Sequence, residues 1–170
     1  MLALPKKTDY ALIALYYLLE RPDRVAPARE IAEAYHLPCA LLMNVMKELH
    51  QGGLVRSVRG ARGGYQVAPA LREATLYDVV VLTSGVEPAL TECCQELVPH
   101  EPSSEAPASG LRCQVGHTCP VRQPLRALHH RLVRFLKDVK VVDLLVPGVR
   151  IDVPLEAVGV AAGGNEGEGE

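Results

Sequence analysis

The chain has no tryptophan and only one phenylalanine among its 170 residues, so any hydrophobic core that it forms must be aliphatic. It also lacks an apolar run near the ~20 residues that a membrane-spanning helix needs. The apolar stretch near the start is flanked by Asp9 and Glu20, and no small-residue cleavage site follows it, which argues against a signal peptide. We therefore expect a cytoplasmic protein that does not contact a membrane.

Catalytic signatures are missing as well. The sequence has no glycine-rich phosphate loop and no H-E-x-x-H motif, and its histidines form no legible set with a nucleophile and an orienting group. Charge is unevenly spread: residues 1–75 carry ten lysines and arginines against seven acids, whereas residues 76–170 carry eight against thirteen. A basic first half suits a protein that meets phosphate at one end only, and we expect no enzyme activity.

An even cysteine framework is also absent. The chain has five cysteines, and an odd number in a reducing compartment does not predict structural disulfides. Four of them fall within a short segment just before the last predicted helix: Cys93, Cys94, Cys113 and Cys119. Thiolates are soft ligands that suit an iron–sulfur cluster or zinc, and a thiol switch between two of these cysteines is the metal-free alternative.

The hydrophobic periodicity predicts a mainly α fold with a small β-hairpin wing. We expect helices over 8–20, 28–35, 38–50, 75–84 and 120–145, with Thr8 as the cap of the first and a glycine-rich hairpin over 54–68. This order is that of a winged helix-turn-helix followed by a long C-terminal dimerisation helix. The predicted units are a DNA-binding domain in 1–85, a cysteine-bearing sensor loop in 86–119, the dimerisation helix in 120–146 and a disordered tail in 147–170.

The third helix is the candidate for the major groove of DNA. Leu42, Val45, Met46 and Leu49 follow the i, i+3, i+4, i+7 pattern of a core-facing stripe. The opposite face then carries Cys39, Ala40, Met43, Asn44 and Lys47. An asparagine can pair with an adenine edge and a lysine with guanine or phosphate, whereas Cys39 would be a small neutral contact. The alternative is an ordinary solvated helix face.

The hairpin tip is basic and rich in glycine. It carries Arg56, Arg59 and Arg62, and Ser57 could donate to a phosphate. An arginine on such a tip can enter a narrow minor groove, where the negative potential is strongest. A solvated basic turn is the alternative, but the position of the hairpin directly after a helix-turn-helix favours DNA.

The last predicted helix carries an apolar seam whose members are spaced by four and three residues in alternation. They are Val121, Leu125, Leu128, Leu132, Phe135, Val139 and Val142. Such a seam over three heptads predicts a helix that packs against a partner, and arginines flank it. We favour a second copy of the chain as that partner, with packing against the first helix of the same chain as the alternative.

Three segments resemble the bacterial IscR/NsrR/CymR regulators: KKTDYALIAL (6–15), REIAEAYHLP (29–38) and LVRSVRGARGGYQVAPALREATLYDVV (54–80). The string S-V-R-G-x-x-G-G-Y before a threonine-led helix is highly specific to that family, and the resemblance covers roughly residues 3–145. It implies a homodimer on a palindromic operator in double-stranded DNA. It also implies that the third helix reads the major groove and that Arg59 enters the minor groove.

The same resemblance implies a sensor. Relatives that bind an iron–sulfur cluster have three cysteines before the dimer helix, and Cys113 and Cys119 match the second and third. Cys93 or Cys94 would be the first, although the gap to Cys113 is longer than usual. IscR-like relatives have a histidine three residues after the last of these cysteines as the fourth ligand, and this chain has Arg122 at that position. The NsrR-like ligand, an aspartate from the first helix of the partner, corresponds to Asp9.

The resemblance therefore predicts a 2Fe–2S or 4Fe–4S cluster that senses redox state, nitric oxide or iron–sulfur status. His117 is a local alternative for the fourth ligand, and Asp9 has the simpler alternative role of a first-turn acid in a helix. A regulator of the same family with no cluster, using a thiol switch or zinc, is the alternative function.

Overall fold

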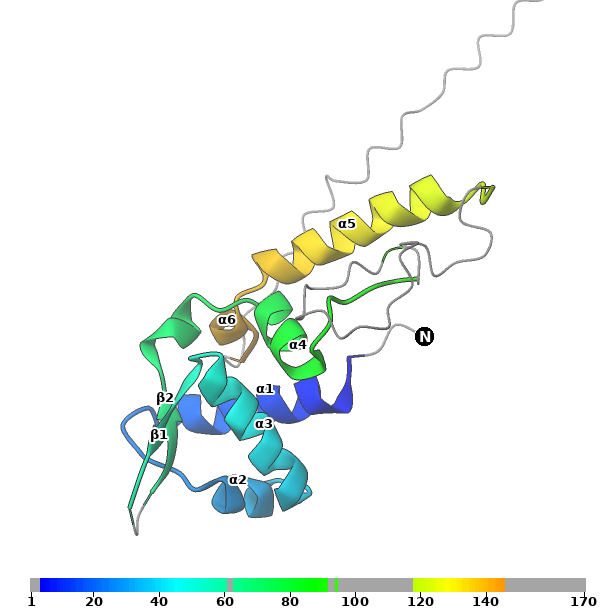
Figure 1. Cartoon of the computed structure of the whole chain (residues 1–170). Helices are drawn as coiled ribbons and strands as arrows, with labels where there is room; N and C mark the ends of the chain where they lie inside the picture. Colours follow the sequence, from blue (N-terminus) through cyan, green and yellow to red (C-terminus); the bar gives the residue numbers. More distant parts are fainter. Residues whose placement is uncertain (1–3, 61–62, 92–93, 95–117, 146–170) are drawn as a thin grey trace, which may run out of the picture.

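The computed structural model describes residues 4–60, 63–91, 94 and 118–145. Its elements are α1 (Lys6–Leu19), α2 (Ala28–Ala34), α3 (Cys39–Gln51), β1 (Val55–Val58), β2 (Gly64–Val67), the 3-10 helix η1 (Pro69–Arg72), α4 (Leu76–Ser84), α5 (Arg122–Asp138) and α6 (Val141–Leu145). Figure 1 shows the β1–β2 hairpin projecting from the end of the molecule where α2 lies, whereas α5 runs along the opposite end. The mainly α fold with one hairpin agrees with the sequence-based prediction.

Helix α1 lies at the centre of the fold. Ala11, Ala14 and Leu15 are fully buried, because the helix packs against both α3 and α4. The prediction that Thr8 caps this helix is wrong: the helix begins at Lys6, and the carbonyl of Pro5 accepts the first helical hydrogen bonds. Thr8 instead lies inside the helix with 0% exposure, and its hydroxyl is 2.8 Å from that of Thr83 on α4.

The turn between α2 and α3 sets the direction of α3. His36 has a positive φ of 53°, which turns the chain, and Pro38 then precedes the first residue of α3 in an extended conformation, as its N-cap. The predicted core stripe of α3 is confirmed, since Leu42, Val45, Met46 and Leu49 are all 0% exposed. This burial turns the opposite face of α3 away from the core.

Helix α4 begins at a capping box. The backbone N–H of Asp78 donates to the Thr75 hydroxyl, and the Asp78 carboxylate accepts from the Thr75 backbone N–H. This reciprocal pairing satisfies backbone donors that a helix start leaves open. It confirms the predicted threonine-led start of this helix.

The sequence predicts one continuous helix up to residue 145, and the structure corrects this. Helix α5 ends at Asp138, Val139 is extended, and α6 starts at Val141. The break coincides with main-chain pairing between residues 139–141 and residues 74–76 at the start of α4: the N–H of Leu76 donates to the Val139 carbonyl at 2.8 Å, and that of Val141 donates to the Ala74 carbonyl at 2.9 Å. The seam is therefore not one helical stripe over three heptads.

The C-terminal part of the seam packs within the chain. Val139 and Leu136 form a small cluster with Leu76 and Val80, and Phe135 packs against it. Val121 and Leu128, at the other end of α5, are 51% and 54% exposed. Within the described ranges, no helix combines the length and the apolar content that crossing a membrane would need.

Candidate nucleic-acid interface

The outward face of α3 is exposed as the sequence predicts. Met43 is 56% exposed, and Ala40, Asn44 and Lys47 are exposed as well. Cys39 differs from them, because it is half-buried and packs against the core at the first residue of α3. The face thus offers one amide, one ammonium and one flexible apolar side chain, which is a set that can distinguish base edges in a major groove.

The hairpin β1–β2, here called the wing together with its connection 59–63, is antiparallel. Arg56 lies opposite Gln66 and Ser57 opposite Tyr65. Successive residues of a strand point to opposite faces, so Arg56 and Ser57 lie on different faces of the wing. Both are exposed, as is Arg59, whereas Arg62 lies outside the described residues.

The wing is fixed to the body of the protein by its second strand. The N–H of Ala26 donates to the Tyr65 carbonyl at 2.9 Å, and the N–H of Tyr65 donates to the Ala26 carbonyl at 2.8 Å. Gly64 fits this close approach because a Cβ there would lie 2.4 Å from the Ala26 oxygen. Gly60 has a φ of +127°, which side chains rarely adopt. The glycines of the motif therefore fix where the arginines stand.

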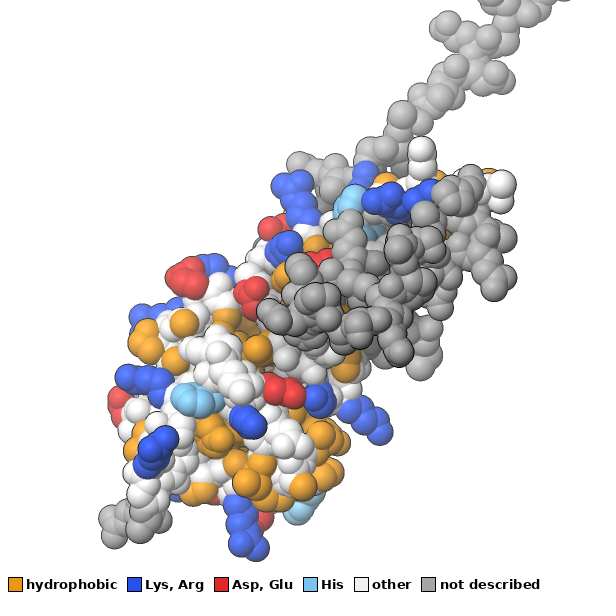
Figure 2. Space-filling model, viewed as in Figure 1, with side chains coloured by type: hydrophobic (Ala, Val, Ile, Leu, Met, Phe, Trp, Pro, Cys, Tyr) orange, Lys and Arg blue, Asp and Glu red, His pale blue; other side chains and the backbone are white. Residues whose placement is uncertain are grey.

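Lys47, Arg56 and Arg59 form no ion pair among the described residues. Figure 2 shows basic side chains interspersed with hydrophobic ones over the end of the molecule that holds α2, α3 and the hairpin. Unpaired cations beside apolar groups can meet phosphates and base edges together.

Only some of the predicted sensor residues lie within the described part of the chain. Cys94 is buried, and its Sγ accepts a hydrogen bond from the Thr91 hydroxyl at 3.3 Å. Cys119 is half-buried shortly before α5, and Asp9 is exposed in the first turn of α1. Cys93, Cys113 and His117 lie outside the described residues. In the part of the chain that the structure describes, no three potential metal ligands come together.

Residues 4–147 match the Rrf2 family, described as iron-dependent transcriptional regulators. The chain belongs to the Rrf2 family. A relative in Aquifex aeolicus (strain VF5), named as an HTH-type transcriptional regulator, is 33% identical over 136 residues, which span 80% of this chain and 86% of the relative. This confirms the predicted resemblance. It also places the chain in a family of DNA-binding transcriptional regulators.

Solved structures confirm the winged helix-turn-helix fold. CymR of B. subtilis, the global cysteine regulator, aligns with a TM-score of 0.59 at 22% identity, over 85% of this chain and 97% of that one. IscR of T. potens aligns with a TM-score of 0.57 at 19% identity, over 85% of this chain and 86% of that one. At these identities the likeness establishes the shared fold.

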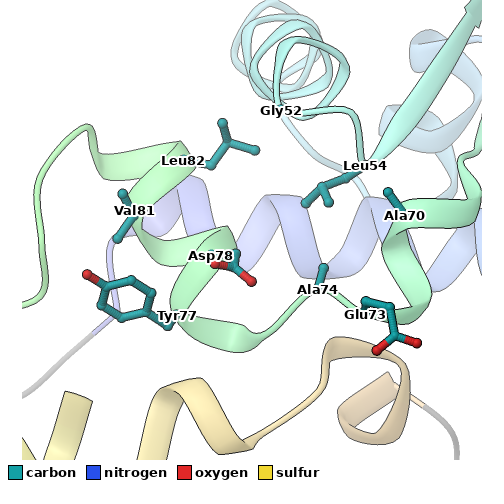
Figure 3. Close-up of a pocket in the computed structure, with 9 residues that line it drawn as sticks. All are labelled: Gly52, Leu54, Ala70, Glu73, Ala74, Tyr77, Asp78, Val81 and Leu82. Carbon is teal, nitrogen blue, oxygen red and sulfur yellow. The ribbon is translucent and has the colours of Figure 1, made fainter. Parts of the chain in front are cut away.

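Two features of this Rrf2 regulator have no signal in its sequence. One is an open groove of about 470 Å³ between the end of α3 and α4, lined by Leu54, Ala74, Tyr77 and Leu82 among others. Figure 3 shows Leu54 and Leu82 on opposite sides of it.

The other feature is an ion pair beside the outward face of α3: Lys7 Nζ donates to Glu48 Oε1 at 2.7 Å. These partners are 41 residues apart, so local sequence patterns could not reveal them.

Proposed function

We propose that this Rrf2 regulator acts as a homodimer that binds a palindromic DNA operator through α3 and the wing, under the control of a cysteine-ligated iron–sulfur cluster. The observation that carries the proposal is that one protein surface presents both the exposed face of α3 and, on the anchored wing, Arg56 and Arg59, which are exposed and form no ion pair among the described residues. In a winged helix-turn-helix, these two elements meet the major groove and the adjacent backbone or minor groove.

In this proposal, Asn44 and Lys47 contact base edges or phosphate, Met43 contacts thymine methyl groups, and Arg59 enters the minor groove. Cys39 and Ala40 line the start of α3 at close range to the DNA. Arg56, Ser57 and Arg62 hold phosphates. Contacts to phosphates position the protein, whereas the contacts from α3 carry the choice of sequence.

The homodimer is supported by two exposed apolar side chains, one just before α5 and one in its first half. Val121 and Leu128 are more than half exposed although both are large apolar side chains. A second copy that packs its own α5 there would bury them, and arginines at the edges of the seam would stay in water. Two-fold symmetry would then present two α3 helices to half-sites about one helical turn apart.

The cluster is supported by the kind of donor atoms near the start of α5. Cys119 stands before that helix with Cys113 upstream, Cys93 or Cys94 would supply the third thiolate, and Asp9 of a second protomer is the proposed fourth ligand. Asp9 fits this role because its carboxylate is exposed and makes no hydrogen bond within the described residues. When bound, an iron–sulfur cluster would supply a centre that reacts with oxidants and nitric oxide.

DNA binding is tested by mobility shift on operator fragments across a salt series. We expect affinity to fall steeply with salt, since phosphate neutralisation releases counterions. Arg59→Ala should weaken binding by roughly tenfold or more. The matched control is Arg134→Ala, which removes the same charge from an 85% exposed side chain on α5. An operator affinity that does not depend on salt, or equal losses of affinity in both variants, would argue against the proposal.

The cluster is tested by visible absorption and by iron and sulfide analysis of protein purified without oxygen. Wild-type protein and Cys39→Ala, which removes a thiol outside the proposed ligand set, should contain equal iron, whereas Cys113→Ala and Cys119→Ala should lose it. The number of iron and sulfide ions bound per protomer, together with the absorption spectrum, distinguishes 2Fe–2S from 4Fe–4S. Colourless protein that contains zinc would support the zinc alternative instead of the cluster. A disulfide among these cysteines would support the thiol switch.

A further inference from the structure

An acidic residue lies on the helix that is proposed to read DNA. Glu48 directly follows Lys47 on α3, one turn after Asn44, and its side chain is 27% exposed. Its Oε1 accepts the hydrogen bond from Lys7, while its Oε2 is buried and has no hydrogen-bond partner in the structure. Lys7 is thus the group that neutralises this carboxylate within the described residues.

The ion pair is held by firm anchors on both sides. Thr8, which follows Lys7, is fully buried and bonded to Thr83. Leu49, which follows Glu48, is also fully buried. Surface ion pairs are usually weak because two mobile side chains must be ordered to make them. Here the backbone on each side is already fixed, so less conformational entropy is lost when the pair forms.

The charge of Glu48 matters because phosphates crowd a DNA groove. A free carboxylate beside Lys47 would repel the backbone and cancel part of the attraction of that lysine. The Glu48 carboxylate stays near the DNA-facing surface, because this residue lies at the edge between the core stripe and the outward face of α3. A cation from another helix is one way to keep this edge neutral.

We propose that Lys7 is a positioning residue for DNA binding. It draws Glu48 toward α1 and neutralises it, so that the outward face of α3 meets DNA with Lys47 as its dominant charge. The inference rests on the proposed DNA-binding surface, because it needs α3 to face the duplex. It assigns a function to α1 that the helix-turn-helix pattern does not contain.

The test is a mutant cycle with full-length protein and an operator fragment. Lys7→Met leaves Glu48 charged and unpaired, and should weaken binding about tenfold. Lys6→Met is the matched control, because Lys6 is the exposed neighbour with no ion pair in the described residues, and its effect should stay within about twofold. Glu48→Gln should restore the Lys7→Met protein to near wild-type affinity and leave the single variant at least as tight as wild type.

Each outcome is decisive. Equal losses in the Lys7 and Lys6 variants, or failure of Glu48→Gln to rescue, would show that Lys7 merely adds attraction or touches phosphate itself, and would overturn the inference. If Lys7→Met does not fold by circular dichroism, the Glu48→Gln single variant decides, since weakened binding there would overturn the inference and undiminished binding would support it. Wild-type protein that binds no DNA would instead refute the proposed function.

Discussion

At the scale of single residues, the wing depends on contacts that its own motif does not reveal. The string S-V-R-G-x-x-G-G-Y predicts a tight basic hairpin, and the structure has one over β1 and β2. The need for glycine at position 64, however, comes from Ala26, which lies 38 positions earlier and pairs with Tyr65. Sequence reasoning could predict the hairpin from local turn chemistry, but not this distant neighbour.

Gly64→Ala should therefore destabilise the protein by about 2 kcal/mol, because a Cβ must displace backbone atoms that cannot move aside. Gly52→Ala is the matched control: the atoms nearest to its Cβ would belong to the flexible Leu82 side chain, which can rotate, and its cost should stay within about 0.5 kcal/mol. Urea unfolding of both variants measures the difference. Equal costs would mean that the contact with Ala26 does not constrain the wing.

The buried threonine pair ties α1 to α4 through a single polar contact. Thr8 and Thr83 are 0% and 2% exposed, and the Thr83 hydroxyl also donates to the Val79 carbonyl at 2.8 Å. Thr8→Val keeps the volume and removes one hydroxyl, so we expect a loss of about 1 kcal/mol in unfolding free energy.

Thr83→Val and the double variant complete this cycle. Because the two side chains share one hydrogen bond, the double variant should lose less than the sum of the single losses. Chemical unfolding under one set of conditions provides all three values. Additive losses would show that the two hydroxyls act independently.

At the scale of elements, the sequence predicts the helices of the first half within a few residues, because core stripes are local signals, although the predicted cap of the first helix is wrong. The same reasoning fails at the end of α5. The seam continues through Val139 and Val142, so periodicity favours one helix, yet the helix breaks where the main chain pairs with residues 74–76. Lys140 adds a hydrogen bond to Glu73, which lowers the pKa of Glu73 and raises the pKa of Lys140.

The break determines which valine of α6 is buried. Val141 is 0% exposed, whereas Val142 is only partly buried. Val141→Ala should cost about 2 kcal/mol in unfolding free energy, and Val142→Ala clearly less. A continuous helix with the predicted seam would favour Val142 as the buried residue. Denaturant titrations measure the loss for each variant. A larger loss for Val142→Ala than for Val141→Ala would support an uninterrupted helix instead.

At the scale of the whole molecule, the apolar side chains of Val121 and Leu128 are exposed in the single chain, and the proposed dimer would cover them. Leu128→Glu places a charge in that surface, where burial without a partner is costly. We expect a shift from dimer to monomer at micromolar concentration in sedimentation experiments, with weaker operator binding as a result. Arg134→Glu changes the charge at an exposed position of the same helix and should leave the dimer intact.

A variant that stays dimeric with Glu at position 128 would place the interface elsewhere. Retained operator affinity in a monomeric Leu128→Glu protein would show that DNA binding does not require the dimer.

The candidate site itself was only partly predictable: exposure of the α3 face and the wing followed from the sequence, whereas the partner of Glu48 and the groove beside α4 depend on tertiary packing.

The main-chain bonds on either side of Lys140 have a mechanical consequence. They join the end of α5 to the start of α4 as two strands of a sheet are joined, so the two helices cannot swivel independently at this point. A displacement at the first turn of α5, about 25 Å from this junction along the helix, would then tilt α5 as a rigid rod. The junction would relay such a tilt straight to α4 and, through the threonine pair, to α1.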